Sequence, residues 1–518
     1  MSVLSQVDVT NCWRGRRCFA AYLWNAGEKL AGKSLHGVRL RMARAWTRSL
    51  ALDLDSVLPG PPHLDAELSQ LDARSAHALQ AVRLALRDDC VAALPIALAC
   101  IDGAPAQSRL VSIARTVCRL AYWKLGDWAR FQDTGALPST TAKKGDLGLQ
   151  AFDGALEAAI ELQQLRFGAA SRLAQDVLAL VPGRRPCVHT GLASVLATAL
   201  LFQLRYEHGA LAEAEESVRN LLPLIRERGC AEAVLRVYPL LAKIARHRAH
   251  GDLAMLTLTE GEALGSKRGW SRLVAACLEE RVELLVRAGR LDEAEMCLER
   301  MRALFVGQGH SHYVQLAVHR HFTLARARID LTRAPSFKIL LTLKRLHREA
   351  TAGGDLYLAA QLATRVAEAY AALEEATDAT ETLVSALELG AKVGMYQSFV
   401  DGGPLIGELL RSIAAEGEPP GRRFLLPYMK SVLRGWQMAN QGTASEDVQS
   451  TLRLTGPLSA REHRILQLIS RGHSNKRVAR ELSIAPETVK SHAKHIFVKL
   501  GAQTRMEAVS RATTLGLI

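Results

Sequence analysis

Apolar residues recur at helical spacing through the middle of the chain, and short turns interrupt them at a regular interval. The glycines of these turns are Gly126, Gly168, Gly209, Gly251 and Gly289. Weaker turns near Asp88, Ala334–Pro335 and Ala376 continue the interval on both sides. A helix, a turn and a second helix repeated about every 40 residues predict an α-solenoid, because one pair cannot bury its apolar face without its neighbours. The alternative is a helical array whose glycines are ordinary helix ends with no meaningful period.

The pattern changes after residue 415. The run Glu416-Gly-Glu-Pro-Pro-Gly421 breaks any helix, residues 425–436 resume one, and residues 437–456 have the polar composition of a linker. We therefore predict an all-α protein with a helical-repeat region at 1–415, a short helix and linker at 416–456, and a small C-terminal domain at 457–518.

The segment 458–518 predicts four short helices. Ser459 and Glu462 have the spacing of a capping box, Gly472 ends the first helix and Ser474 caps a second one. Pro486 suits the first position of a third helix, which runs to about Leu500. A fourth helix spans about 504–515. A short second helix, a tight turn and a longer basic third helix are typical of a helix-turn-helix.

The third helix carries the candidate chemistry. Steps of 100° per residue place Val489, Ala493, Ile496, Phe497 and Leu500 on the inner side. The opposite arc holds Glu487, Lys490, Ser491, Lys494 and Val498, and one flank holds Thr488, His492, His495 and Lys499. Such side chains can reach base edges and phosphates in a major groove. The alternative interpretation is a basic, solvated helix in a small bundle.

Charge supports a polyanionic partner. The formal net charge of +14 is concentrated at the two ends: residues 458–518 contain 11 Lys and Arg against 4 acids, and residues 1–50 contain 9 against 2. Residues 51–457 therefore carry no net charge. A basic module binds nucleic acid through phosphate neutralisation, whereas the basic N-terminal segment 1–50 has no assigned role.

Together these residues resemble the LuxR/NarL-type DNA-binding domain. The resemblance is carried by Leu458-Ser-Ala-Arg-Glu462, Gly472-His-Ser-Asn475, Leu482-Ser-Ile484, Thr488-Val-Lys490 and Glu507-Ala-Val509. It implies that Lys490, Ser491 and Lys494 face the bases, and that Asn475, Thr488, His492 and Lys499 lie near the DNA backbone. Lys476 and Glu487 complete the candidate set. The resemblance also implies a homodimer contact through Arg505–Leu515, double-stranded promoter DNA as a partner, and RNA polymerase as a second one. Ala485 departs from the family, which usually has Ser or Thr there.

Upstream, Gly394-Met-Tyr-Gln-Ser-Phe-Val-Asp-Gly-Gly-Pro-Leu405 is similar to the C-terminal part of MalT-like large regulators. Those proteins begin with an ATPase domain, which requires a phosphate loop. Gly27 to Ser34 matches GxxxxGK[ST] through Gly27, Gly32, Lys33 and Ser34, but no buried strand precedes it and helices follow at once. We therefore expect no nucleotide cofactor and a MalT-like regulator without its ATPase domain.

Other function classes are disfavoured. No Ser/His/Asp, Cys/His or paired-carboxylate pattern stands out, so we expect no enzyme. Nine scattered cysteines without a CxxC pair suit free thiols and no metal site. No apolar run reaches membrane-spanning length.

We expect a cytoplasmic, nucleoid-associated regulator of the activating kind, whose repeats sense an unknown small molecule, peptide or protein. The alternatives are a P-loop ATPase through Gly27–Ser34, an interaction scaffold with a vestigial DNA module, and a sigma-factor region.

Overall fold

The computed structural model describes residues 73–102, 104, 109–135, 147–180, 191–219, 221–306, 311–416, 425–441, 460–470, 473–482 and 484–499. All regular secondary structure within these ranges is helical. The candidate phosphate loop at Gly27–Ser34, the capping residue Ser459 and the candidate dimer helix Arg505–Leu515 lie outside the described residues.

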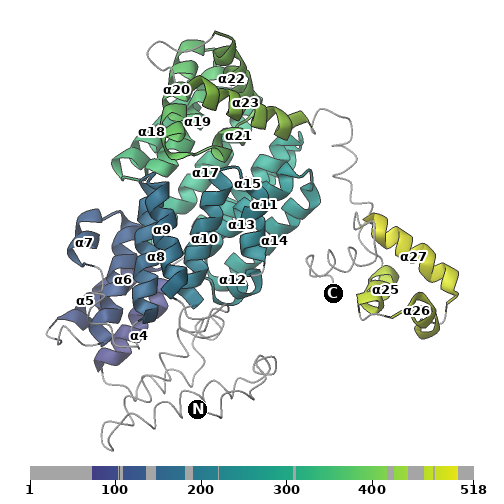
Figure 1. The fold of residues 1–518 in the computed structure, drawn as a ribbon, viewed down its shortest axis with the longest axis horizontal. Helices are drawn as coiled ribbons and strands as arrows, with labels where there is room; N and C mark the ends of the chain where they lie inside the picture. Colours follow the sequence, from purple (N-terminus) through teal and green to yellow (C-terminus); the bar gives the residue numbers. More distant parts are fainter. Residues whose placement is uncertain are drawn as a thin grey trace, which may run out of the picture.

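Successive helix pairs form the repeat region, and Figure 1 shows them stacked from α4 to α20. The pairs are α4 (Ala73–Leu86) with α5 (Cys90–Ile101), α6 (Arg109–Leu125) with α7 (Trp128–Asp133), α8 (Leu147–Gln163) with α9 (Phe167–Leu180), α10 (Gly191–Glu207) with α11 (Leu211–Arg219) and the short α12 (Leu222–Arg228), α13 (Ala231–His247) with α14 (Gly251–Arg268), α15 (Ser271–Arg287) with α16 (Leu291–Val306), α17 (His312–Arg333) with α18 (Phe337–Ala352), and α19 (Leu356–Ala372) with α20 (Ala376–Val393). The predicted all-α solenoid is confirmed.

The turns within the pairs keep the predicted interval, but two of the predicted glycines are not the turning residues. The residues with left-handed backbone (φ between 57° and 77°) in these turns are Asp88, Gly126, Leu165, Gly209, Ala249, Gly289 and Glu374. Gly168 and Gly251 lie instead in the first turns of α9 and α14. The chain therefore uses Leu165 and Ala249 where glycine would be free of strain.

The solenoid is wound tightly enough for distant repeats to touch. The Trp270 indole at the start of α15 donates a hydrogen bond of 3.0 Å to the carbonyl of Leu86, at the end of α4. One step further along, the Trp128 indole donates to the carbonyl of Gly353 at 2.8 Å. Contacts therefore recur between repeats that lie 184 and 225 residues apart in the sequence.

Residues 394–403 contact α10, α13 and α15, and we call them the inner segment. Its Tyr396 amide donates to the carbonyl of Glu207 at 2.7 Å. The Asp401 carboxylate accepts hydrogen bonds from Tyr206 (2.6 Å) and Arg246 (2.8 Å), on α10 and α13. At Gly403 an added Cβ would overlap the Glu368 carboxylate, so the backbone must approach α19 without a side chain.

The inner segment leads into the helices that close the repeat region. It contains the single turn α21 (Gln397–Val400) and is followed by α22 (Pro404–Glu416) and α23 (Leu425–Gln441), which pack on each other and on α19 and α20. Apolar residues of α21, α22 and α23 belong to the same buried cluster as those of α4 to α15. The helix predicted to end at 436 continues to Gln441, because Met438 and Ala439 have good helix propensity in a stretch interpreted only as polar.

A second, smaller unit follows in the sequence. It consists of α25 (Ala460–Ser470), α26 (Asn475–Glu481) and α27 (Pro486–Lys499). Its buried apolar residues form a cluster of their own.

Candidate DNA-binding surface and interior cleft

The C-terminal unit is held together by a small apolar core. Ile465, Leu466, Leu468 and Ile469 of α25 pack with Val478 and Ala479 of α26 and with Val489, Ala493 and Ile496 of α27. The three residues of α27 have the spacing of one helical face, as predicted. The core therefore fixes which side of α27 faces outward.

Individual residues determine where α26 and α27 begin. The Ser474 hydroxyl accepts a hydrogen bond from the Arg477 amide at 3.4 Å and caps α26. Pro486 is the first residue of α27. Before it, Ala485 offers only its backbone carbonyl, which accepts from the amides of Thr488 (3.0 Å) and Val489 (3.2 Å). The tight turn therefore forms without a side-chain cap on α27.

The outward arc of α27 carries most of the candidate residues. Glu487, Thr488, Lys490, Ser491 and Lys494 are exposed, and His492 is half-buried on the flank. The Lys490 ammonium lies 3.7 Å from the Glu487 carboxylate, and both side chains are largely open to solvent. An exposed pair of this kind contributes little to stability, so both groups are available to a partner.

The remaining candidates are less fully placed. Asn475 is half-buried at the start of α26. Lys476 and Lys499 lie on α26 and α27, and their side chains fall outside the described part. Sequence reasoning assigned no DNA-binding role to Arg477 and Arg480, which are exposed on α26 beside the same turn. Because they are three residues apart, their side chains lie on the same face of this short helix.

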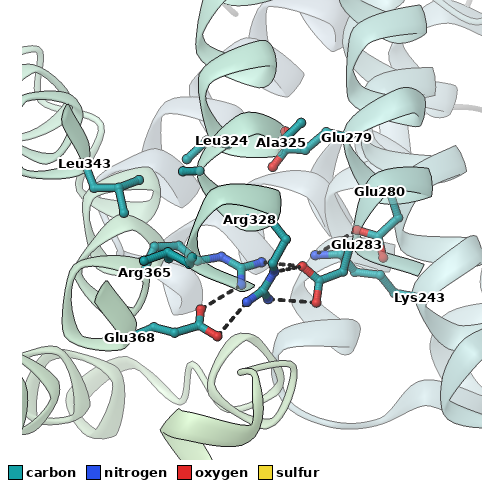
Figure 2. A pocket seen from close by; sticks show the side chains of 12 residues that line it. Lys243, Glu279, Glu280, Glu283, Leu324, Ala325, Arg328, Leu343, Arg365 and Glu368 are labelled. Atoms are coloured by element: carbon teal, nitrogen blue, oxygen red, sulfur yellow. Dashed lines mark hydrogen bonds and ion pairs between the residues drawn. The ribbon is translucent and has the colours of Figure 1, made fainter. Parts of the chain in front are cut away.

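A second feature, a cleft within the repeat region, was not predicted at all. It lies among α13, α15, α17, α18 and α19 and has an empty volume of about 480 Å³. Its apolar lining residues are Leu324, Ala325, Ala327, Leu331 and Leu343. Its charged lining residues are Lys243, Glu279, Glu280, Glu283, Arg328, Arg365 and Glu368 (Figure 2).

Two arginines and two glutamates form a lattice at one end of the cleft. Arg328 donates to Glu283 at 2.7 Å and to Glu368 at 2.5 Å. Arg365 joins the same two carboxylates, at 3.4 Å and 3.2 Å (Figure 2). Burial opposes ionisation of Glu283, but Arg328, Arg365 and Arg287 outweigh it and hold the pKa of this carboxyl well below its ordinary value. The lattice is therefore fully ionised and internally paired.

The other end of the cleft holds Lys243 and Glu280. Burial raises the pKa of Glu280, and the nearby Lys243 and Arg246 offset this only in part. Burial lowers the pKa of Lys243, but Glu280 and Asp401 outweigh it and raise that pKa overall. Sequence reasoning missed this pair because its members are far apart in the sequence, on different helices, and charged residues inside a solenoid have no periodic signature.

Other classes of site find little support in the described part of the chain. Within the described residues, no group of three or more His, Cys, Asp or Glu side chains has the arrangement of a metal site. The cysteines at 90, 100, 118, 230, 277 and 297 are buried free thiols. None of the helices described combines the length and apolar character needed to cross a bilayer.

Comparison with known proteins identifies the C-terminal unit. Residues 456–512 match the family described as "Bacterial regulatory proteins, luxR family". A stretch of 225 residues, 40% of this chain, is 27% identical to the HTH-type transcriptional regulator MalT of Serratia proteamaculans (strain 568). The chain spans only about a quarter (24%) of the length of that relative. Residues 456–512 are thus a LuxR-family helix-turn-helix domain, and the MalT-like resemblance is supported.

Proposed function

We propose that the chain is a sequence-specific, DNA-binding transcriptional regulator that inserts α27 into a major groove. The observation that carries this proposal is the exposed polar arc of α27, opposite a fixed apolar core, in a LuxR-family domain. A helix of this kind in a helix-turn-helix is the element that meets base edges.

In this proposal Lys490, Ser491 and Lys494 meet bases, with Glu487 beside them. Asn475, Lys476, Thr488, His492 and Lys499 meet the phosphate backbone, and we add Arg477 and Arg480 to the backbone set because they are exposed beside the turn. Lysine can donate to guanine O6 and N7, and serine pairs with several bases.

The rest of the proposal concerns partners. We propose that the helical repeats bind an effector, that a homodimer forms through Arg505–Leu515, and that the regulator recruits RNA polymerase and activates transcription in the cytoplasm at the nucleoid. The similarity to a transcriptional regulator named MalT supports the regulatory role.

The test is selection of binding sites from random duplex DNA with the full chain. We expect one enriched motif, and two half-sites of it in opposite orientation if the dimer forms. Lys490→Ala together with Lys494→Ala should weaken binding to that motif by about tenfold or more.

The matched control is Arg461→Ala with Arg464→Ala, which removes the same charge from exposed positions of α25. This control should retain the motif, with a smaller loss of affinity. Absence of any enriched motif, or equal losses in the two double variants, would contradict the proposal.

A further inference from the structure

The cleft lies where the repeat stacking is interrupted. Helices α15 and α17 share one buried apolar cluster, while α17, α18 and α19 share another. Between them the helices meet largely through the ionic lattice of Arg328, Arg365, Glu283 and Glu368. The empty volume of about 480 Å³ at this junction includes space that is open to solvent.

Most charges of the cleft already have partners. The lattice arginines and glutamates neutralise each other, and Glu279 lies 2.6 Å from His321. None of these groups needs a ligand to complete its hydrogen bonds.

Lys243 and Glu280 differ from the rest. Glu280 is only 7% exposed, and none of the described residues donates a hydrogen bond to its Oε1 atom. The Lys243 ammonium lies 3.7 Å from Glu280 Oε2 and 3.8 Å from Asp401 Oδ2, beyond hydrogen-bond distance from both. In Figure 2 the two side chains occupy the same end of the cleft, facing each other. The buried Glu280 Oε1 lacks a hydrogen bond, which is costly, whereas the half-buried Lys243 side chain is 23% exposed. Both groups can therefore bind a polar ligand.

We propose that this cleft binds a small zwitterion, a free α-amino acid, with its ammonium group on Glu280, its carboxylate on Lys243 and its side chain against Leu324 and Leu343. A zwitterion brings no net charge into the cleft and offers an oppositely charged hydrogen-bonding group to Glu280 and to Lys243 at once. A ligand with a single charge would bond to one of the two groups and add an unbalanced charge to the cleft. The inference deepens the proposed function, since the cleft would be the effector site of the repeats.

Lys243 also connects the cleft to the inner segment, so that ligand binding in the cleft would affect the helices that follow. Its ammonium lies between Glu280 in the cleft and Asp401 in the inner segment. A ligand carboxylate on Lys243 would compete with Asp401 for this cation. The inner segment leads directly into α22 and α23, the last described helices before the LuxR-family domain.

The experiment measures binding of the standard free L-amino acids to the full chain, by thermal shift and then by calorimetry. At least one should raise the thermal midpoint and bind with one-to-one stoichiometry at a Kd below about 10 mM. Its carboxamide, which lacks the negative charge, and its N-acetyl derivative, which lacks the positive charge, should each bind about tenfold more weakly or worse.

Glu280→Gln and Lys243→Met test the two positions separately. Each should weaken binding of that amino acid by about tenfold or more. Glu299→Gln and Lys392→Met, the same charge losses at exposed sites on α16 and α20, should leave it unchanged. If a cleft variant fails to fold, the comparison of blocked derivatives on the unmodified chain still decides the question.

Three results would overturn the inference: no amino acid binds, the blocked derivatives bind equally well, or both cleft variants bind as the unmodified chain does. Site selection from random DNA is independent of these measurements. Failure here with an enriched DNA motif would therefore reject the cleft as an amino-acid site and leave the proposed regulator intact.

Discussion

Asp401 joins the inner segment to α10, α13 and α15. Its carboxylate accepts from Tyr206 and Arg246 and contacts His247, while its backbone carbonyl accepts from Arg287 at 2.7 Å. Burial alone would raise its pKa, but Arg246, His247 and Lys243 reverse the effect and hold the pKa far below its ordinary value.

Asp401→Asn should lower the unfolding free energy of the repeat region by about 3 kcal/mol or more, because it leaves buried cations without their partner. A depressed folded-state pKa contributes stability that is complete above the unfolded pKa of about 4 and is lost as pH falls below it. The difference between the variant and the unmodified chain should therefore be constant from about pH 7 to pH 5 and shrink below about pH 4. Thermal unfolding across this range measures it. Asp133→Asn, at an exposed position, is the control; equal effects of the two changes would refute this role.

The residues just before α26 and α27 allow a matched pair of substitutions. Ser474 caps α26 with its hydroxyl, whereas Ala485 has no side-chain acceptor to cap α27. Ser474→Ala should destabilise the unit by about 1 kcal/mol and Ala485→Ser should stabilise it by a similar amount. The thermal midpoint of the C-terminal transition is the measurement. A shift in the same direction for both would contradict the assigned caps.

At the residue scale, the sequence predicted the exposed residues of α27 but not the charged residues of the cleft. Lys490, Ser491 and Lys494 were placed correctly on the exposed arc because helical geometry and an apolar face determine them. Lys243 and Glu280 could not be predicted, since their meeting depends on how three-dimensional stacking brings α13 and α15 together.

At the scale of elements, the turn positions show what a repeat pattern predicts and where it fails. The interval of about 40 residues follows from the length of a helix pair and is visible in the sequence. The identity of the turning residue is not, because Ala249 adopts φ 57° just before the conspicuous Gly251. No local sequence signal marks the left-handed backbone of Ala249.

Ala249→Gly should stabilise the repeat region by about 1 kcal/mol, because glycine adopts left-handed backbone without steric cost. Gly289→Ala, at the equivalent turn, should destabilise it by about 1 kcal/mol. There φ is 71° and an added Cβ meets nothing within 4 Å, so the backbone alone determines the effect. Denaturant unfolding of both variants measures the two changes. Opposite signs are expected, and a loss in both would contradict the common turn geometry.

At the scale of the whole molecule, the net charge differs between the repeat region and the C-terminal domain. Residues 51–457 carry no net charge, and in their described part many buried charges are paired inside the solenoid. The surplus positive charge of residues 458–518 includes that of the helix-turn-helix. A basic terminal domain beside a neutral repeat region is what the proposed DNA-binding function requires, because DNA is a polyanion.

The most direct test of this account is genome-wide occupancy in the cell of origin, for the unmodified chain and for Lys490→Ala with Lys494→Ala. We expect discrete occupied sites that share one half-site motif, and their loss in the double variant at equal protein level. Identical occupancy in both, or no discrete sites in either, would contradict a regulator that reads DNA through α27.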